Sequence, residues 1–501
     1  MIDLLVYQII KKTFFSTNKV NMTPLIYKLK NGIRCLIYNK DCFNISSILI
    51  LVKSGSVNEP PTYQGTSHFL EHMFFKGTHK RLTQFDIASI IDKYGGVLNA
   101  YTDKEHTGYY INIHNEHFKE AFDILSDMLT NSLFMDKEMQ LEKKVVLNEM
   151  YQRLSNPSYQ NTVNFYETIF KGHKLEHRVI GQSKDINNMT RTALLAYLFY
   201  LYTPKNIVVA VAGKLNVADT KKMIEKTFGQ YNGDVYNLNV IDKKSPHIDI
   251  FNKQLKLLDT YNKKKDIKLK WNSTFKLEIN PKIKHIFVLI GFPGYSYHNK
   301  NKYITSFITH YLSKGMSSVL FQQVRGQRGL VYGISSYHKS FDDTGVYGFK
   351  FSVKDVNRLV ETMYIVLKEC QKLTTDLLDD DIMDKIRTGL ISGFSFLKDS
   401  SNATIDFLGI QCLNHPNTIK TPEEVIEIYK KVTPQQIKKV AQEIFDLNKM
   451  QTCIVSHTKF KKDVIDKVVD KVTFRKATFK KSNDKKRVQK TLLEKVSVKG
   501  K

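Results

Sequence analysis

The chain has 501 residues, of which 42% are hydrophobic and 25% are charged, so it is long enough for several domains with buried cores and is not a fibre or a disordered tail. Its 76 Lys and Arg against 49 Asp and Glu give a formal net charge of +27, but only 11 of the 76 are Arg, which argues against sequence-specific nucleic-acid recognition. The five cysteines form no C-x-x-C pair, which excludes a cysteine zinc site and a disulfide framework and indicates a reducing, intracellular compartment.

The N-terminal residues 1–23 read as an extension or leader. They pair an apolar stretch with Lys11, Lys12 and Lys19, whereas a secretory signal carries its positive charge before the apolar stretch, so secretion is not expected. A leader for the mitochondrial matrix and a plain extension of a cytoplasmic protein both stay open. No apolar run approaches the roughly 18 residues that span a bilayer, so no transmembrane segment is expected.

Residues 24–228 show the pattern of mixed α and β structure. Periodicity predicts strands at 29–38, 47–52, 98–102, 107–114 and 207–212, and helices at 67–76, 83–94, 116–130, 137–154 and 193–202. Residues 229–276 then turn polar and rich in Asn and Lys, which predicts an interdomain linker.

After the linker the same order of elements returns at an offset of about 240 residues. Residues 47–57 pair with 285–295, and Thr190 with the helix that follows it pairs without gaps with Thr433 and its helix. The sequence therefore predicts a duplication, with the second copy at 277–457. Residues 458–501 form a basic tail with 16 Lys and Arg and 5 Asp and Glu, interpreted as a solvated extension, with binding to nucleic acid or anionic lipid as the alternative.

The pentapeptide His68-Phe-Leu-Glu71-His72 carries the strongest chemical signal. On a helix these three polar residues share one arc of about 100°, and the apolar residues between them face the other way. Two histidines one turn apart are often only a surface feature, but they can direct ring nitrogens to one point, which suits tetrahedral zinc. Glu71 beside them can take a proton from bound water.

A catalytic zinc needs a third protein ligand and leaves one position for water. Glu142 and Glu149 are seven residues apart on the helix predicted at 137–154, so both face the same way. One of them can bind the metal while the other supports it or the histidines.

Four segments at 68–78, 95–102, 122–129 and 143–150 resemble the inverted-zincin metallopeptidases, the family of pitrilysin, insulin-degrading enzyme and the mitochondrial processing peptidases. The resemblance covers residues 24–457 and is closest to the short, two-domain processing-peptidase-like branch. It implies an α+β fold of two duplicated, structurally similar domains, each a mainly antiparallel sheet covered by helices, which together form half of a clamshell.

The resemblance also implies site residues. It implies Zn²⁺ as cofactor, with His68, His72 and Glu149 as ligands, Glu71 as general base and Glu142 as supporting carboxylate. An edge strand at 98–102, with Asn99 and Ala100, is expected to bind the substrate backbone by strand addition.

The second copy has lost this set of residues. With Lys76 set against Lys314, the residues opposite His68, Glu71 and His72 are Ser306, Thr309 and His310. His310 is interpreted as a structural residue, and the second copy as a supporting domain.

The second copy has its own candidate pair. Arg325 and Tyr332, seven residues apart, are similar to the family's pair that reaches the substrate backbone and the developing oxyanion. The alternative is a polar helix end that runs into a strand.

We therefore expect a zinc-dependent endopeptidase that cleaves short or unfolded peptides, leader peptides among its candidate substrates. Because the chain carries both the zinc motif and the Arg325–Tyr332 pair, a homodimer is expected, with a heterodimer with a related subunit as the alternative. No specific nucleic-acid partner is expected. Two other functions stay open: a non-catalytic scaffold or partner subunit of a processing-peptidase-like complex, and a nucleic-acid or membrane-surface binder that uses the basic tail.

Overall fold

The computed structural model describes residues 23–233 and 247–478. The predicted leader and most of the basic tail lie outside these residues. The described part divides into two compact units, each assembled from three segments of the chain. Within the described residues, the first unit contains 23–147, 177–233, 247–265 and 394–425, and the second contains 148–176, 266–393 and 426–478.

The first unit is built on a six-stranded sheet with the order β1-β2-β6-β3-β5-β4. Its strands are β1 (Leu25–Lys28), β2 (Arg34–Asn39), β3 (Ile45–Val52), β4 (Val97–Thr102), β5 (Thr107–His114) and β6 (Ile207–Gly213). Only β2 and β6 pair in parallel, and the other neighbours are antiparallel. β4 therefore ends the sheet, and within the described residues no strand pairs with its outer edge.

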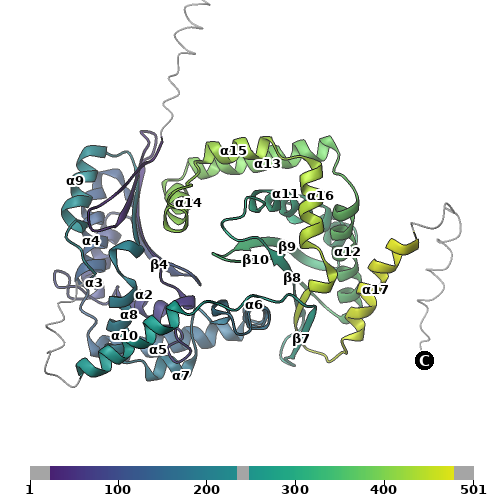
Figure 1. The fold of residues 1–501 in the computed structure, drawn as a ribbon, viewed down its shortest axis with the longest axis horizontal. Coiled ribbons are helices and arrows are strands. Elements are labelled where there is room, and N and C mark those ends of the chain that lie inside the picture. Colours follow the sequence, from purple (N-terminus) through teal and green to yellow (C-terminus); the bar gives the residue numbers. More distant parts are fainter. Residues whose placement is uncertain (1–22, 234–246, 479–501) are drawn as a thin grey trace, which may run out of the picture. The chain divides into compact units, whose positions relative to one another are not determined.

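Helices cover both faces of this sheet (Figure 1). The helices of the first unit are α2 (Thr66–Met73), α3 (Gln84–Lys93), α4 (Phe118–Asn131), α7 (Ser183–Asn188), α8 (Arg191–Leu201), α9 (Val217–Phe228), α10 (His247–Lys263) and α14 (Ser401–Asn414). Helix α5 (Asp136–Ser155) begins in this unit, and α13 (Asp380–Lys398) and α15 (Pro422–Lys430) also cross unit boundaries.

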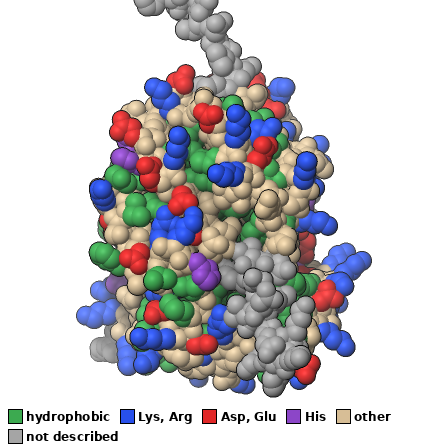
Figure 2. Space-filling view, turned by 90° about the vertical axis from the view of Figure 1, so that its left-hand side faces the viewer, with side chains coloured by type: hydrophobic (Ala, Val, Ile, Leu, Met, Phe, Trp, Pro, Cys, Tyr) green, Lys and Arg blue, Asp and Glu red, His purple; other side chains and the backbone are tan. Residues whose placement is uncertain are grey.

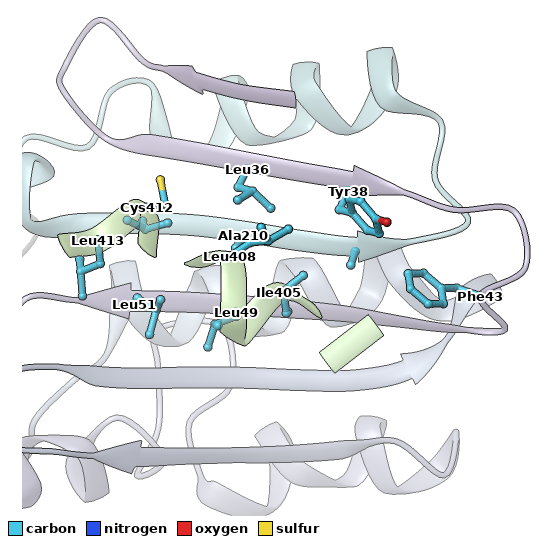
Figure 3. Packing of buried hydrophobic residues seen from close by; sticks show 12 residues of the cluster. Leu36, Tyr38, Phe43, Leu49, Leu51, Ala210, Ile405, Leu408, Cys412 and Leu413 are labelled. Atoms are coloured by element: carbon cyan, nitrogen blue, oxygen red, sulfur yellow. The ribbon is translucent and has the colours of Figure 1, made fainter. Parts of the chain in front are cut away.

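Helix α14 comes from the second half of the sequence, but it packs on the first sheet (Figure 3). Ile405, Leu408 and Cys412 lie against alternate residues of β2, β3 and β6, such as Leu36 and Leu49, and all five side chains are buried. Apolar side chains on both faces of a strand predict burial on both faces, and α4 lies on the opposite side of the sheet (Figure 1).

The second unit is built on a five-stranded sheet with the order β7-β11-β8-β10-β9. Its strands are β7 (Thr274–Ile279), β8 (Ile286–Gly294), β9 (Val331–Ser340), β10 (Gly345–Val353) and β11 (Gln451–Ser456). Its helices are α6 (Pro157–Ile169), α11 (Lys302–Ser313), α12 (Val356–Thr375), α16 (Pro434–Ile444), α17 (Asp463–Thr478) and a π-helical turn, η6 (Phe321–Gly326).

The two units repeat one topology, as the predicted duplication requires. In both sheets the first of the five equivalent strands, β2 or β7, pairs in parallel with the last strand of the copy, β6 or β11, and the remaining pairs are antiparallel. Helices α8 and α16 are both 11 residues long, and each starts at a threonine whose side chain accepts a backbone hydrogen bond, Thr190 or Thr433. The α+β fold of two similar domains is thus confirmed.

Some local expectations differ from the structure. The strand predicted at 29–38 begins only at Arg34, because a turn closes at Gly32, whose φ of 109° favours glycine, and separates β1 from β2. Residues 229–276, predicted as linker, contain the helix α10, which packs on α8. The domain boundaries predicted from the sequence stay a prediction. Among residues 23–233 and 247–478, no helix combines the length and apolar composition that a membrane-spanning helix needs.

Candidate active site

Helix α2 carries the His68-Phe-Leu-Glu71-His72 segment, and packing and hydrogen bonds at its N-terminus hold the helix in place. Its apolar side, Phe69 and Leu70 among others, is fully buried. At its N-terminus the buried carboxylate of Glu59 accepts hydrogen bonds from the backbone N–H groups of Gly65, at 2.6 Å, and Ser67, at 2.8 Å. Burial raises the pKa of Glu59 to about 7, against the lowering effect of these two hydrogen bonds.

His68, His72 and Glu149 come together as a cluster that could hold a metal ion. One ligand atom from each residue lies within 4.8 Å of the other two, and the imidazole centroids are 4.7 Å apart. Two ring nitrogens and one carboxylate oxygen are a donor set that suits zinc with one position left open. The boundary between the units falls after Leu147, but it lies inside the continuous helix α5, which carries Glu149.

Glu142 holds His72 from the side. Nδ1 of His72 donates a hydrogen bond of 2.7 Å to Oε1 of Glu142, and Nζ of Lys76 lies 2.6 Å from the other oxygen. Burial alone would raise the pKa of this carboxyl, but the hydrogen bonds from His72 and Lys76 outweigh it and hold the pKa below its usual value. With Nδ1 bonded to the carboxylate, the lone pair of Nε2 is the one available to a metal.

The two acidic residues of α5 therefore play different parts. Glu149 lies in the cluster with His68 and His72, and its Oε1 also forms an ion pair with Nη2 of Arg153 at 2.6 Å. Glu142 contacts His72 from outside this cluster. Helical periodicity placed both on one side of α5, but it left open which of them reaches the histidines.

Glu71 contacts the edge strand of the sheet. Its Oε2 accepts a hydrogen bond of 2.5 Å from the hydroxyl of Thr102, the last residue of β4. Asn99 and Ala100 lie on the same strand, where the Asn99 amide oxygen accepts from the Ala100 N–H at 2.8 Å. The predicted general base and the predicted substrate-binding strand are thus in contact through Thr102.

Arg325 and Tyr332 come together in the second unit. Arg325 lies on the π-helical turn η6, and its guanidinium carbon is 4.8 Å from the ring centroids of both Tyr332 and Phe321. Tyr332 is 85% exposed, so its hydroxyl is open to a ligand. Single π-helical turns occur often at functional sites.

In the second copy, the His310 ring lies against the backbone of α13. His310 packs against Gly389, where an added Cβ would lie 2.5 Å from the ring nitrogen Nε2. Burial, together with Lys314 and Lys385, lowers the pKa of His310. A neutral, packed imidazole next to a glycine fits the structural role that the sequence predicted for it.

A second cluster, His173 with Asp266 and Asp343, has the spacing of a metal site but a different hydrogen-bond pattern. Nδ1 of His173 accepts from the Leu175 N–H at 3.1 Å, which leaves the proton of the neutral ring on Nε2. Nε2 lies 3.1 Å from Asp343, and this hydrogen bond lowers the pKa of the Asp343 carboxyl. The ring therefore donates to a carboxylate and has no free lone pair for a metal.

Sequence reasoning missed three contributors to the site. Lys76 and Thr102 lie in two of the segments that carry the family resemblance. Lys76 contacts Glu142 and Thr102 contacts Glu71, and in each case the partner comes from another element. Strand alternation would have placed Thr102 on the same face as Ala100. For Glu59 no local signal exists, because a carboxylate six residues before a helix N-cap is not a recognised capping pattern.

The sequence matches two family descriptions: Insulinase (Peptidase family M16) over residues 35–183, and Peptidase M16 inactive domain over residues 188–390. An uncharacterized zinc protease of Rickettsia bellii is 29% identical over 422 residues, which cover 84% of this chain and 94% of that protein. The uncharacterized zinc protease YmxG of Bacillus subtilis is 27% identical over 425 residues, covering 84% of this chain and 95% of that protein.

Two solved structures share the fold. One is a protease from Helicobacter pylori, with a TM-score of 0.76 and 19% identity, covering 87% of this chain and 99% of that chain. The other is a peptidase M16 inactive domain from Pseudomonas fluorescens, with a TM-score of 0.71 and 15% identity, covering 88% of this chain and 99% of that chain. The family matches, over residues 35–183 and 188–390, include parts of both copies of the duplication, so the inverted-zincin resemblance is confirmed. The chain belongs to peptidase family M16, the zinc-dependent insulinase family.

Proposed function

We propose that this chain is a zinc-dependent endopeptidase that cleaves short or unfolded peptides. The observation that carries the proposal is the cluster of His68, His72 and Glu149, which has the donor set of a catalytic zinc site, with Glu71 on the same helix. The curated relatives named as zinc proteases support it.

In this proposal His68, His72 and Glu149 hold Zn²⁺, and Glu142 orients His72. Bound zinc supplies Lewis acidity to the scissile carbonyl and to water. Glu71 accepts a proton from the water whose oxygen bonds to the carbonyl carbon, and it returns that proton to the leaving amine nitrogen as the C–N bond breaks. Thr102 holds the carboxylate of Glu71 through its 2.5 Å hydrogen bond.

The substrate would bind as an added strand on the outer edge of β4, along Asn99 and Ala100. Strand addition requires an extended backbone, so short or unfolded peptides fit and folded proteins do not. Leader peptides belong to this class.

Arg325 and Tyr332 are proposed to donate hydrogen bonds to the substrate backbone and to the oxyanion of the tetrahedral intermediate. The chain carries this pair in its second unit and the His68, Glu71 and His72 motif in its first. We propose a homodimer in which each copy supplies both kinds of residue, and a heterodimer with a related subunit is the alternative.

Two other functions have less support. A non-catalytic scaffold does not require the intact donor set of His68, His72 and Glu149. The other alternative is a nucleic-acid or membrane-surface binder that uses the basic tail, and a continuous basic patch on the folded part would favour it. On the face of the molecule seen in Figure 2, Lys and Arg side chains are scattered among acidic and apolar ones.

The test is cleavage of a short quenched-fluorescence peptide by the purified chain before and after removal of metal with a chelator. The proposal predicts cleavage that is lost with the metal and restored by added Zn²⁺. Cleavage that persists in the metal-free protein would contradict the zinc mechanism.

A further inference from the structure

Two neighbouring residues at the end of β4 make hydrogen bonds on opposite faces of the sheet. Thr102 donates to Glu71 on helix α2, at 2.5 Å, and Tyr101 donates to Oδ1 of Asp406 on helix α14, at 2.7 Å. Successive side chains of a strand point to opposite faces, so one short segment links the predicted general base to a helix on the other side of the sheet.

The Tyr101 side chain is placed by its cross-strand neighbour. Tyr101 is paired with Gly108 on β5, and an added Cβ on that glycine would lie 2.7 Å from the phenol ring. The ring therefore lies directly over the glycine. Burial, and then the negative charge of Asp406, raise the pKa of the Tyr101 hydroxyl, which remains a donor.

Helix α14 is a rigid support for Asp406. Its neighbours Ile405 and Leu408 are fully buried in the apolar cluster under the sheet (Figure 3). At its first residue, the hydroxyl of Ser401 lies 2.8 Å from that of Ser47 on β3. An edge strand is hydrogen-bonded to one neighbour only, so a second attachment limits how far β4 can shift.

We propose that Asp406 is a positioning residue for the peptidase site, a role that rests on the function proposed above. By accepting the hydrogen bond of Tyr101, it holds the end of β4 where Thr102 meets Glu71. Asp406, from the second half of the sequence, then helps to position the Glu71 carboxylate through the edge strand β4.

The duplicated sheet supplies a matched comparison. In the second unit Tyr337 is paired with Gly348 in the same way, with an added Cβ 2.6 Å from its ring. Within residues 23–233 and 247–478, the Tyr337 hydroxyl has no hydrogen bond to a carboxylate, whereas that of Tyr101 has one. The tyrosine-over-glycine packing is common to both sheets, and the acidic partner occurs on the sheet whose edge strand contacts Glu71.

The test uses Tyr101→Phe, which removes the hydroxyl and keeps the ring over Gly108. We expect kcat for the quenched-fluorescence peptide to fall by roughly 10- to 100-fold, because a shift of about 1 Å in a catalytic group costs about 100-fold. Zinc content should change little, and KM should rise by a smaller factor than kcat falls. Asp406→Leu should match Tyr101→Phe, and Asp406→Asn, which keeps an acceptor oxygen, should recover most of the activity.

Coupling to Thr102 separates positioning from general stability. Thr102→Val should lower kcat, Thr102→Ser should restore it, and Tyr101→Phe should have little further effect in the Thr102→Val background. The control Tyr337→Phe should leave activity unchanged. If Tyr101→Phe lowers kcat by the same factor in the parent protein and in the Thr102→Val background, the proposal is overturned.

Hydrogen–deuterium exchange gives a readout that does not need activity. In the full chain, Tyr101→Phe should speed exchange of the amides at 97–102 and leave those of β10 unchanged. If the parent protein cleaves no peptide, the proposed function fails, and exchange still decides the present inference: unchanged exchange at 97–102 would overturn it.

Discussion

Nδ1 of His72 lies 2.7 Å from Oε1 of Glu142, and Nζ of Lys76 lies 2.6 Å from the second oxygen of the same carboxylate. The carboxylate is thus held from two sides and fixes the plane and the tautomer of the imidazole. A ligand whose orientation is fixed before the metal arrives loses less conformational entropy on binding.

Glu142→Ala should therefore weaken zinc binding by about 10- to 100-fold, as loss of an outer partner of a metal ligand does. Chelator competition measures this affinity. Glu138→Ala, on the same helix α5, is the matched control and should leave the affinity unchanged. Equal affinity in the two variants would show that Glu142 does not orient His72.

Glu59 should make stability depend on pH. Its folded-state pKa of about 7 lies above the unfolded value of 4.5, so between these pH values the folded chain binds the extra proton. The contribution of Glu59 to stability is then greatest below pH 4.5 and falls as the pH rises through about 7.

Glu59→Gln should remove this contribution to the pH dependence of the unfolding temperature. It should also destabilise the chain by about 1–3 kcal/mol, because the amide NH₂ would face a backbone N–H of Gly65 or Ser67. Thermal unfolding across the pH range measures both effects. An unchanged pH profile would show that Glu59 does not bind the proton.

Leu408→Ala should destabilise the first unit by about 2–5 kcal/mol, because it leaves a cavity between α14 and the sheet. Ile410→Ala, at a partly buried position on the same helix, should cost less. Denaturant unfolding compares the two variants. Equal losses would contradict the packing of α14 against this sheet.

Mixing Glu71→Gln with Tyr332→Phe should recover part of the activity that each variant lacks alone. In the proposed homodimer one hybrid site then combines an intact histidine cluster with an intact Arg325–Tyr332 pair. Peptide cleavage after verified subunit exchange measures the recovery. A fully active monomer, or no recovery despite exchange, would contradict the assembly.

The fold and the grouping of His68, His72 and Glu149 could be predicted because their signals are local or repeated. Helical periodicity put His68, Glu71 and His72 on one side of α2, and the equal elements after Thr190 and Thr433 indicated the duplication. A resemblance then distinguished Glu149 from Glu142, which periodicity alone could not.

The remaining contacts join residues that no local pattern connects. Tyr101 and Asp406 are 305 positions apart in the sequence. Asp406 comes close to the first sheet because α14, which belongs to the second half of the sequence, folds as part of the first unit. The apolar residues of α14 predict a buried helix, but not which sheet buries it. The contact of Thr102 with Glu71 likewise depends on how the edge strand lies beside α2.

The most direct test of the account is the Glu71→Gln variant, with zinc content and peptide turnover measured on the same preparation. The amide keeps the shape of the side chain but cannot accept a proton. We predict one zinc-binding site as in the parent chain and a loss of turnover of about 100-fold or more. Near-normal hydrolysis by a zinc-loaded Glu71→Gln protein, with contaminating proteases excluded, would contradict the assignment of Glu71 as the base.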